Sequence, residues 1–360
     1  MTAPMGVREL AAALDGRIGC PGGDDWERLI GQANRTMTIA SLGAGLAANS
    51  AQRNGPVPED ANAYLTCVVE ANRERNRRLM ALLEEVLDVL AQIGVMPILL
   101  KGAALLVALG EPAMRGRIMG DLDLMLPAGT TREACNRLRE YGFEVYADSG
   151  LDDAPIVLFR DSDVGMVDLH GRMKGSNPRF DHALLAPHCR TVRIGGQEAL
   201  LPSPAAQAAL LTSHDQLQEL DYWRGLIDMR HLHDLAQLAR SADGIDWQVL
   251  DGLFTTRQAQ RALRTQLLAL KALFRVPVPR RYSSGLWPRI QHRRQLLQAD
   301  RPRLRWPLTL VTLALEWPRG VRDDLSAASQ SRRHLVPAPF LRGKNMARKA
   351  IRSPGPGKFC

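Results

Sequence analysis

Three aspartates stand among apolar residues, where a negative charge is costly unless something neutralises it. Asp121 and Asp123 alternate with leucines in the stretch GDLDLML, and Asp168 lies in the stretch MVDLH. A strand turns successive side chains to opposite faces, so Asp121 and Asp123 are expected to point the same way. Two like charges on one face need a partner, and a cation bound by carboxylate oxygens is one. The alternative is a solvated strand end.

The segments around these acids predict a mixed sheet with helices packed against it, between about residues 95 and 200. VMPILLKG is typical of a short buried strand, AALLVALG of a helix, and GDLDLMLP of a strand that ends at a proline. A helix is expected over TTREACNRLREYGF, and three more strands over FEVYA, PIVLFRD and VGMVDLH. The fold class is therefore α/β in its broad α+β sense.

The helical patterns divide the chain into four expected regions. They are an N-terminal helical segment over 1–94 with a long helix from about 60 to 93, the mixed-sheet core over 95–200, a helical C-terminal domain over 201–330, and a basic tail over 331–360. Ser203 and Pro204 fit the N-cap and first position of the helix that opens the third region. The tail is expected to be solvated and flexible, with binding of nucleic acid or an acidic partner as the alternative.

The wider pattern resembles the nucleotidyltransferases of the polymerase-beta superfamily. Members of that superfamily carry a Gly-Gly or Gly-Ser pair, then an acid-x-acid strand, then one more acid on a neighbouring strand. More narrowly, the chain resembles the family of uncharacterised nucleotidyltransferases over about residues 25–240. The residues that carry the likeness are Leu100-Lys101-Gly102, Arg117, Asp121-Leu122-Asp123-Leu124 and Val167-Asp168-Leu169-His170. The pair in this chain is Gly102-Ala103, so the serine hydroxyl of the superfamily pair is absent.

The resemblance implies transfer of a nucleoside monophosphate from a nucleoside triphosphate (NTP) to an acceptor hydroxyl, with release of pyrophosphate. In such reactions two divalent ions, about 3.5–4 Å apart, clamp the attacking and leaving oxygens. Mg²⁺ or Mn²⁺ suits carboxylate ligands. Asp121 and Asp123 would bridge the ions, and Asp168 would complete the site as a ligand or as a base.

The resemblance also implies that the nucleotide lies against the start of the helix that follows the first strand. Gly102 leaves room for a triphosphate, and the amides of Gly102 and Ala103 would donate to phosphate at the positive helix end. Lys101 or Arg117 would neutralise the phosphates, and His170 would touch substrate or metal. The structural alternatives are an ion pair of Lys101 with a sheet acid, Arg117 as a brace of the loop before the Asp strand, and His170 as a neighbour that fixes an acid. Asp168 has its own alternative, as a structural partner of Arg172 or of a nearby amide.

Polar residues in the helical region after 203 are expected to be structural. His214, His231 and His233 lie on amphipathic helices and are expected at the edge of the core. Asp228 and Asp234 are expected to be solvated or paired with nearby arginines. The sequence therefore predicts one site, on the sheet.

Composition indicates in which compartment the protein is found and whether it spans a membrane. The chain has 360 residues and a formal net charge of +9. Its five cysteines are scattered without metal-ligand spacing, which favours a reduced, intracellular protein. The N-terminus lacks the pattern of a secretory signal, and the most apolar stretches are too short to span a bilayer. We therefore expect a cytoplasmic protein that does not act at a membrane.

The acceptor and the oligomeric state are not fixed by the sequence. The resemblance implies family members in natural-product gene neighbourhoods, which favours a peptide or a small molecule as acceptor, while the positive charge favours an anionic one such as RNA. Two other functions share part of the pattern. A metal-dependent glycosyltransferase also uses Asp-x-Asp, but the strand-Gly-helix unit and Asp168 fit it less well. A non-catalytic nucleotide-binding or partner-binding module is compatible with the Gly102-Ala103 pair.

Overall fold

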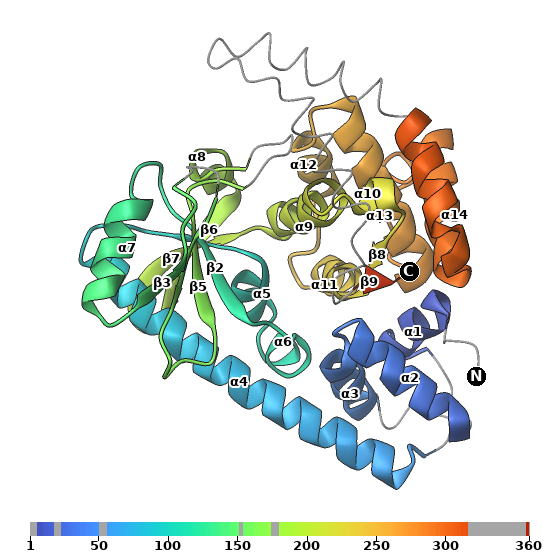
Figure 1. Cartoon of the computed structure of the whole chain (residues 1–360), viewed down its shortest axis with the longest axis horizontal. Coiled ribbons are helices and arrows are strands. Elements are labelled where there is room, and N and C mark those ends of the chain that lie inside the picture. Colours follow the sequence, from blue (N-terminus) through green and yellow to red (C-terminus); the bar gives the residue numbers. More distant parts are fainter. Residues whose placement is uncertain are drawn as a thin grey trace.

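The computed structural model describes residues 6–17, 23–49, 56–150, 154–173, 180–315 and 358–359. A mixed sheet of seven strands forms one half of the molecule, and a packed group of helices forms the other (Figure 1). The mixed α+β fold class expected from the sequence is confirmed.

The central pair of the sheet carries the three aspartates. The strands are β1 Ile98–Leu99, β2 Asp121–Met125, β3 Glu144–Ala147, β4 Ile156–Phe159, β5 Met166–His170, β6 Cys189–Ile194 and β7 Gln197–Pro202, in the order β3-β4-β5-β2-β1-β7-β6. β2 runs parallel to β5 and β1 runs parallel to β7, while the other neighbouring strands are antiparallel. The parallel pair β2–β5 therefore lies in the middle of the sheet.

The two faces of the sheet bury different things. Leucines at 122 and 124 of β2 and the apolar residues 167 and 169 of β5 join a core with α4 (Glu59–Ala91) and α7 (Thr131–Glu140). Met125, on the opposite face of β2, packs into the core of the helical half. The alternation of apolar and polar residues therefore turns Asp121 and Asp123 toward the helical half.

The long helix α4 connects the two halves. Its apolar stripe between Leu79 and Leu90 is buried against the sheet, and its first turns pack on α3 (Ile39–Ala48) (Figure 1). The expected helix over about 60–93 is confirmed, with its end two residues earlier. Gly94 follows with φ of 67°, a left-handed conformation that favours glycine at a helix end.

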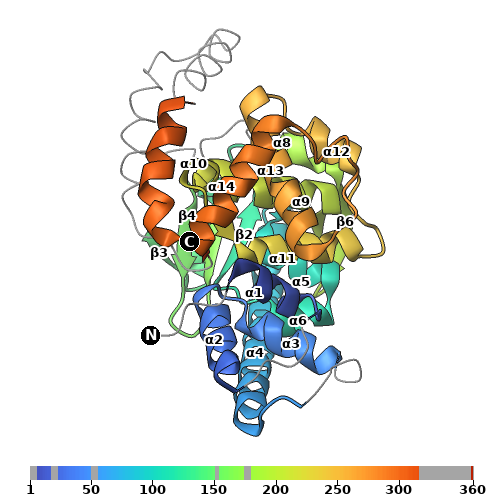
Figure 2. The ribbon, with the colours of Figure 1, turned by 90° about the vertical axis from the view of Figure 1, so that its right-hand side faces the viewer.

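Helices from both ends of the described chain build the other half. Those before the sheet are α1 (Val7–Leu14), α2 (Gly23–Arg35) and α3. Those after it are α9 (Pro204–Thr212) with its π-helical continuation η3 (Ser213–Gln218), α10 (Asp221–Arg224), α11 (Met229–Arg240), α12 (Trp247–Gly252), α13 (Arg257–Phe274) and α14 (Leu286–Asp300). α1 packs against α11, α13 and α14, so these helices share one hydrophobic core (Figure 2). The Ser203 side chain accepts from Ala206 N at 3.3 Å, as its N-cap pattern predicts.

Short elements complete the fold. They are α5 (Lys101–Leu109), α6 (Glu111–Gly116), α8 (His182–Leu185), η2 (Ala186–His188), β8 (Ile227–Asp228), η4 (Pro302–Leu304) and β9 (Lys358–Phe359). Of the expected basic tail, only β9 lies within the described residues, and it pairs with β8. Within the described ranges, the structure has no helix with both the length and the apolar composition that crossing a membrane requires.

Candidate active site

The pairing of β2 with β5 brings two acids side by side. The strands are in parallel register, with Asp123 opposite Asp168 and Asp121 opposite Met166. Paired residues of neighbouring strands point to the same face, so the carboxyl groups of Asp121, Asp123 and Asp168 share the face turned toward the helical half. The sequence-based expectation that acids from separate strands converge is met for Asp123 and Asp168.

Asp123 lies at the centre of a small buried network. It is 2% exposed, and its Oδ1 atom lies 2.6 Å from Lys101 Nζ and 2.9 Å from His170 Nε2. Burial alone would raise the pKa of Asp123, but the Lys101 ammonium and the His170 contact overcome it and hold the pKa well below its ordinary value. Asp123 is therefore ionised. Lys101 and His170 have the contacts of their structural alternatives, an ion pair with a sheet acid and a neighbour that fixes it.

Among the described residues, the other two acids have no such contacts, and the Asp123 carboxylate repels both. Burial, followed by the charges of Asp123 and Asp121, raises the pKa of Asp168 to about 6. Loss of hydration and the nearby Asp123 carboxylate raise the pKa of Asp121 as well, although Asp121 lies at the solvent-exposed start of β2. Lys101 contacts only Asp123 among the three acids, and the charges of Lys101, Arg230 and Arg117 do not offset the raised pKa of Asp121. The negative charge that remains favours binding of a further cation.

The donor atoms fit a hard divalent ion. One oxygen each from Asp123 and Asp168 and one nitrogen from His170 lie within 4.8 Å of one another. Carboxylate oxygens suit Mg²⁺ and Mn²⁺, and Mn²⁺ also accepts an imidazole nitrogen. Asp121 lies outside this compact group, two residues along the same strand face. The centre of the group is therefore Asp123 with Asp168, where the sequence had suggested Asp121 with Asp123 as the bridging pair.

The start of α5 lies directly beside Asp123. Leu100 N donates to Asp123 O at 3.0 Å, which fixes the end of β1 against β2. Lys101 then takes a φ of 44°, a left-handed conformation that is strained for a residue with a side chain. The first N–H groups of a helix have no acceptor within the helix. The strained turn thus places the start of α5 beside Asp123, with the Lys101 ammonium on its carboxylate.

Gly102 has a packing role that the sequence did not indicate. A Cβ atom added there would lie 3.0 Å from Met119 Sδ and 3.2 Å from Met119 Cβ. Such contacts are tighter than normal packing, so a side chain at this position would require Met119 to shift by a few tenths of an ångström. Ala103, the next residue, is completely buried.

Arg117 is buried and turned toward the helical half. It is 5% exposed, its Nε atom lies 3.0 Å from Asp234 Oδ2 on α11, and its Nη1 atom donates to Ile118 O at 2.7 Å. Burial lowers the pKa of Arg117, and the Asp234 carboxylate opposes that effect. These contacts are those of a brace for the loop before β2, the structural alternative to phosphate binding. Asp234 is paired with an arginine, as expected.

Polar residues on the inner side of α4 hold the same loop. Asn76 donates to the carbonyl oxygens of Met114 at 2.9 Å and Arg117 at 2.8 Å. Asn72 donates to Arg115 O at 2.9 Å, and Arg75 Nε to Met119 O at 3.0 Å. Sequence reasoning missed these positioning residues. Two asparagines four residues apart in a helix with a buried stripe were the available signal.

A separate cavity of about 530 Å³ lies between α7 and α8. Arg132, Asp148, Asp181 and His182 are among its lining residues. Of the residues expected to form the site, none lines it. The carboxylate group therefore lies outside this cavity, on the sheet face that looks toward α11.

Comparisons with known proteins give one family. Residues 22–275 match the family described as uncharacterised nucleotidyltransferase. A solved structure that this chain matches is that of the antibiotic-resistance factor ANT(2'')-Ia in solution, with 16% identity and a TM-score of 0.36 over 54% of this chain and 95% of that one. Another is an antigenic nucleotidyltransferase-like protein from Paracoccidioides brasiliensis, with 17% identity and a TM-score of 0.36 over 56% of this chain and 93% of that one. A search of curated proteins gave no match.

Proposed function

Because the chain belongs to the family of uncharacterised nucleotidyltransferases and is a nucleotidyltransferase, we propose that it moves a nucleoside monophosphate from an NTP to an acceptor hydroxyl in a metal-dependent reaction. The acceptor oxygen bonds to the α-phosphorus, the bond to pyrophosphate breaks, and the hydroxyl proton leaves. The observation that carries the proposal is the in-register pair Asp123–Asp168, of which Lys101 contacts only Asp123.

Asp123 and Asp168 are the residues we assign to the divalent ion, with Asp121 beside them. His170 is assigned to hold the Asp123 carboxylate, because its Nε2 atom is directed at Asp123 Oδ1. A bound Mg²⁺ or Mn²⁺ would stabilise negative charge on the phosphate oxygens. Asp123 suits this assignment because it stays ionised across the physiological pH range. Its contacts with Lys101 and His170 fix the direction of one oxygen in advance of binding.

Lys101 and the start of α5 are assigned to the triphosphate. The Lys101 side chain is 19% exposed, so its ammonium is within reach of a ligand while it contacts Asp123. The amides of Gly102 and Ala103 lie in the first turn of the same helix, where backbone donors and the helix dipole favour anions. Arg117 fixes the start of β2 through its ion pair with Asp234. We assign it no phosphate contact.

Asp168 has two chemical roles open to it, and one comparison separates them. As a ligand, its replacement by Asn should weaken Mn²⁺ binding at least about tenfold. As a base for the acceptor hydroxyl, a role that a pKa near 6 suits, its replacement should leave Mn²⁺ binding intact and remove the acidic limb of the pH–rate profile.

The acceptor class is proposed as a peptide or a hydroxyl-bearing small molecule, with RNA as the less favoured choice. The test incubates the protein with Mg²⁺, each of the four NTPs and a panel of short peptides, small-molecule alcohols and RNA oligomers. Mass spectrometry should detect addition of one nucleoside monophosphate to one class, together with pyrophosphate release. Binding of nucleotide sugars but of no NTP would favour a glycosyltransferase instead. NTP binding without transfer to any acceptor class would favour a binding module.

The matched control for this screen is Asp161→Asn. Asp161 is an exposed acid in the turn between β4 and β5, outside the carboxylate group. Transfer should survive in Asp161→Asn and be lost in Asp123→Asn. Failure of the wild-type protein to bind any NTP would contradict the proposal.

A further inference from the structure

A second group of buried acids lies in the helical half. Asp215 lies on η3, Asp221 begins α10, and Asp228 ends β8 and caps α11. Asp215 and Asp221 are fully buried, and Asp228 is 2% exposed. Three carboxylates so far from water are costly unless positive charge neutralises them. We call this group of three carboxylates the ammonium recess, for the reason that follows.

Lys358 brings the neutralising charge from a distant part of the chain. β9 pairs with β8 in antiparallel fashion, with Lys358 opposite Asp228. The Lys358 Nζ atom lies 2.5 Å from Asp221 Oδ2, 3.1 Å from Asp228 Oδ2 and 3.7 Å from Asp215 Oδ1. An ammonium group has three N–H donors. One lysine can therefore face all three carboxylates at once.

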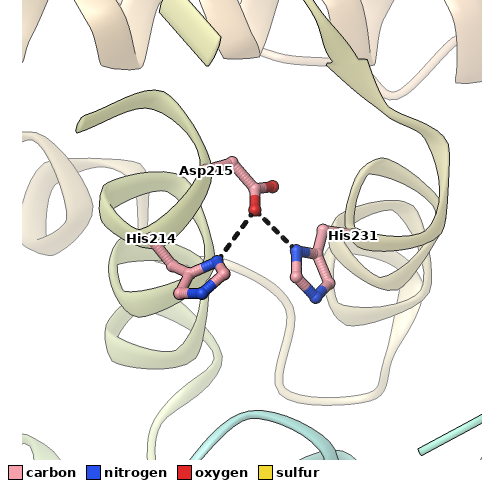
Figure 3. A group of neighbouring side chains, drawn as sticks. All are labelled: His214, Asp215 and His231. Carbon is pink, nitrogen blue, oxygen red and sulfur yellow. Dashed lines mark hydrogen bonds and ion pairs between the residues drawn. The ribbon is translucent and has the colours of Figure 1, made fainter. Parts of the chain in front are cut away.

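Two histidines approach Asp215 from another side. Figure 3 shows His214 and His231 directed at the same oxygen, Oδ1, from Nδ1 atoms 3.1 and 2.7 Å away. Arg230 Nη2 lies 3.4 Å from His231 Nε2. A guanidinium can only donate, so the His231 Nε2 atom is the acceptor and its Nδ1 atom carries the proton. Asp215 thus accepts from imidazole N–H groups.

The recess keeps more acceptor capacity than its neighbours use. Asp215 Oδ2 and Asp221 Oδ1 are buried and have no hydrogen-bond partner among the described residues. Burial raises the pKa of Asp221 to about 7, against the effect of Lys358. Burial alone would lower the pKa of Lys358, but the three carboxylates outweigh burial and raise that pKa well above its ordinary value. The lysine is therefore a full positive charge in a site with oxygens to spare.

We propose that Asp215, Asp221 and Asp228 form a binding site for a primary ammonium group, which this chain fills with its own Lys358 on an added strand. A divalent ion held by His214, Asp215 and His231, whose ligand atoms lie within 4.8 Å of one another, is the competing reading. The ammonium is favoured because both Nδ1 atoms are directed at Asp215 itself, and because one ammonium group, that of Lys358, lies within 4 Å of all three carboxylates. Backbone pairing with β8 selects an extended segment as the carrier of the ammonium.

Lys358 also fixes the start of α11, the helix that faces the carboxylate centre formed by Asp121, Asp123 and Asp168. We call this effect the latch, and its consequence for nucleotide binding rests on the proposed function. Asp228 accepts from His231 N at 3.0 Å and so caps α11. Farther along α11, Asp234 pairs with Arg117, which stands just before β2. Loss of Lys358 should therefore loosen the start of α11 and, through Arg117, weaken nucleotide binding on β2.

The first test replaces Lys358 with Ala in the full chain and measures the unfolding temperature. The midpoint should fall by about 6 °C or more, because three buried carboxylates lose their ammonium. Lys271→Ala is the matched control, since Lys271 is exposed and its Nζ atom makes a long contact of 3.4 Å with Val278 O. That control should shift the midpoint by about 1 °C at most.

Chemical rescue then identifies what the recess binds. Ethylammonium or propylammonium should restore at least half of the loss in Lys358→Ala. Tetramethylammonium, which has the same charge but no N–H donor, should restore none. Where Lys358→Ala does not fold, Lys358→Met combined with Asp221→Asn replaces it. Removal of one carboxylate should make this double variant more stable than Lys358→Met alone.

Three results would overturn the ammonium site: equal midpoints for the Ala variants of Lys358 and Lys271, rescue by tetramethylammonium, or stronger rescue by Mn²⁺ or Zn²⁺ than by alkylammonium. NTP affinity measured by calorimetry on the same variants separates the latch from the proposed function. A wild-type protein that binds no NTP contradicts the proposed function and leaves the ammonium site intact. Unchanged NTP affinity in a destabilised Lys358→Ala variant overturns the latch.

Discussion

The carboxylate centre on the sheet and the ammonium recess contain the same kinds of group, three aspartates, a lysine and histidine, but they differ in burial and in how many of the acids the lysine contacts. In the recess every acid is buried and Lys358 faces all three. On the sheet Lys101 contacts Asp123 alone, Asp121 is exposed and Asp168 is half-buried. Acids that are neutralised by the chain itself serve the fold. Acids left repelling one another at a partly open face are suited to a cation from outside.

The largest expected effect is on catalysis at the carboxylate centre. Asp123→Asn or Asp168→Asn should lower kcat/KM for nucleotidyl transfer at least about 1,000-fold, because each removes charge from the site of phosphate chemistry. Steady-state kinetics with the acceptor found in the screen measure it, with Asp161→Asn as the control. Activity within tenfold of wild type in both site variants would refute the assigned roles.

The next effect concerns the connection between the two regions. Asp234→Asn should lower the free energy of unfolding by about 3 kcal/mol, because it leaves the buried Arg117 guanidinium without its counter-charge. Urea denaturation measures the change. The matched control is Glu111→Gln in the exposed pair with Arg73, whose atoms are 2.8 Å apart and whose side chains are about half exposed. Its loss should cost less than about 1 kcal/mol. Equal costs would mean that burial of the Arg117 pair has no energetic consequence.

The pH dependence of stability tests the raised pKa of Asp168. The folded-state pKa of Asp168, about 6, lies above its unfolded value, so the folded state binds this proton more tightly. The resulting stabilisation is fully present below about pH 4 and is lost as pH rises through about 6. In the presence of EDTA, the wild type should therefore lose about 2 kcal/mol relative to Asp168→Asn over that window. Parallel stability curves for the two proteins would contradict the raised pKa.

The smallest effect tests the packing beside Lys101. Gly102→Ala should cost about 1 kcal/mol, since the added methyl group meets Met119. In a Met119→Ala background the same change should cost nothing further. Gly252→Ala serves as the control, because a Cβ atom there meets no atom within 4 Å. A Gly102→Ala variant as stable as the wild type would show that Met119 yields freely.

What the sequence predicted well depended on local pattern. The alternation in GDLDLML and MVDLH placed the acids on one face, and the apolar stripe placed α4 almost to the residue. The hairpin β6–β7 was missed, although Gly195 and Gly196, both with positive φ, are a recognisable two-residue turn between its strands. Its strands carry exposed arginines and a glutamate, which masked the apolar side of the pattern.

What the sequence could not predict depended on contacts between distant segments. The register that sets Asp168 beside Asp123 and leaves Asp121 at the rim is a tertiary property. The same holds for Arg117, whose partner Asp234 is on another helix, and for Lys358, whose partners lie more than a hundred residues earlier. The local periodicity of a sequence does not indicate such pairs. The sequence therefore cannot distinguish a residue that forms a buried ion pair from one that binds a ligand.

Calorimetric titration of Mn²⁺ in the presence of a non-hydrolysable NTP analogue tests most directly whether Asp123 and Asp168 hold a catalytic cation. The wild type and Asp161→Asn should bind Mn²⁺ and the analogue together, and the double variant Asp123→Asn, Asp168→Asn should lose the Mn²⁺ signal while its circular dichroism stays that of a folded protein. Mn²⁺ binding of unchanged affinity in the folded double variant would contradict the account, because the cation would then lie elsewhere.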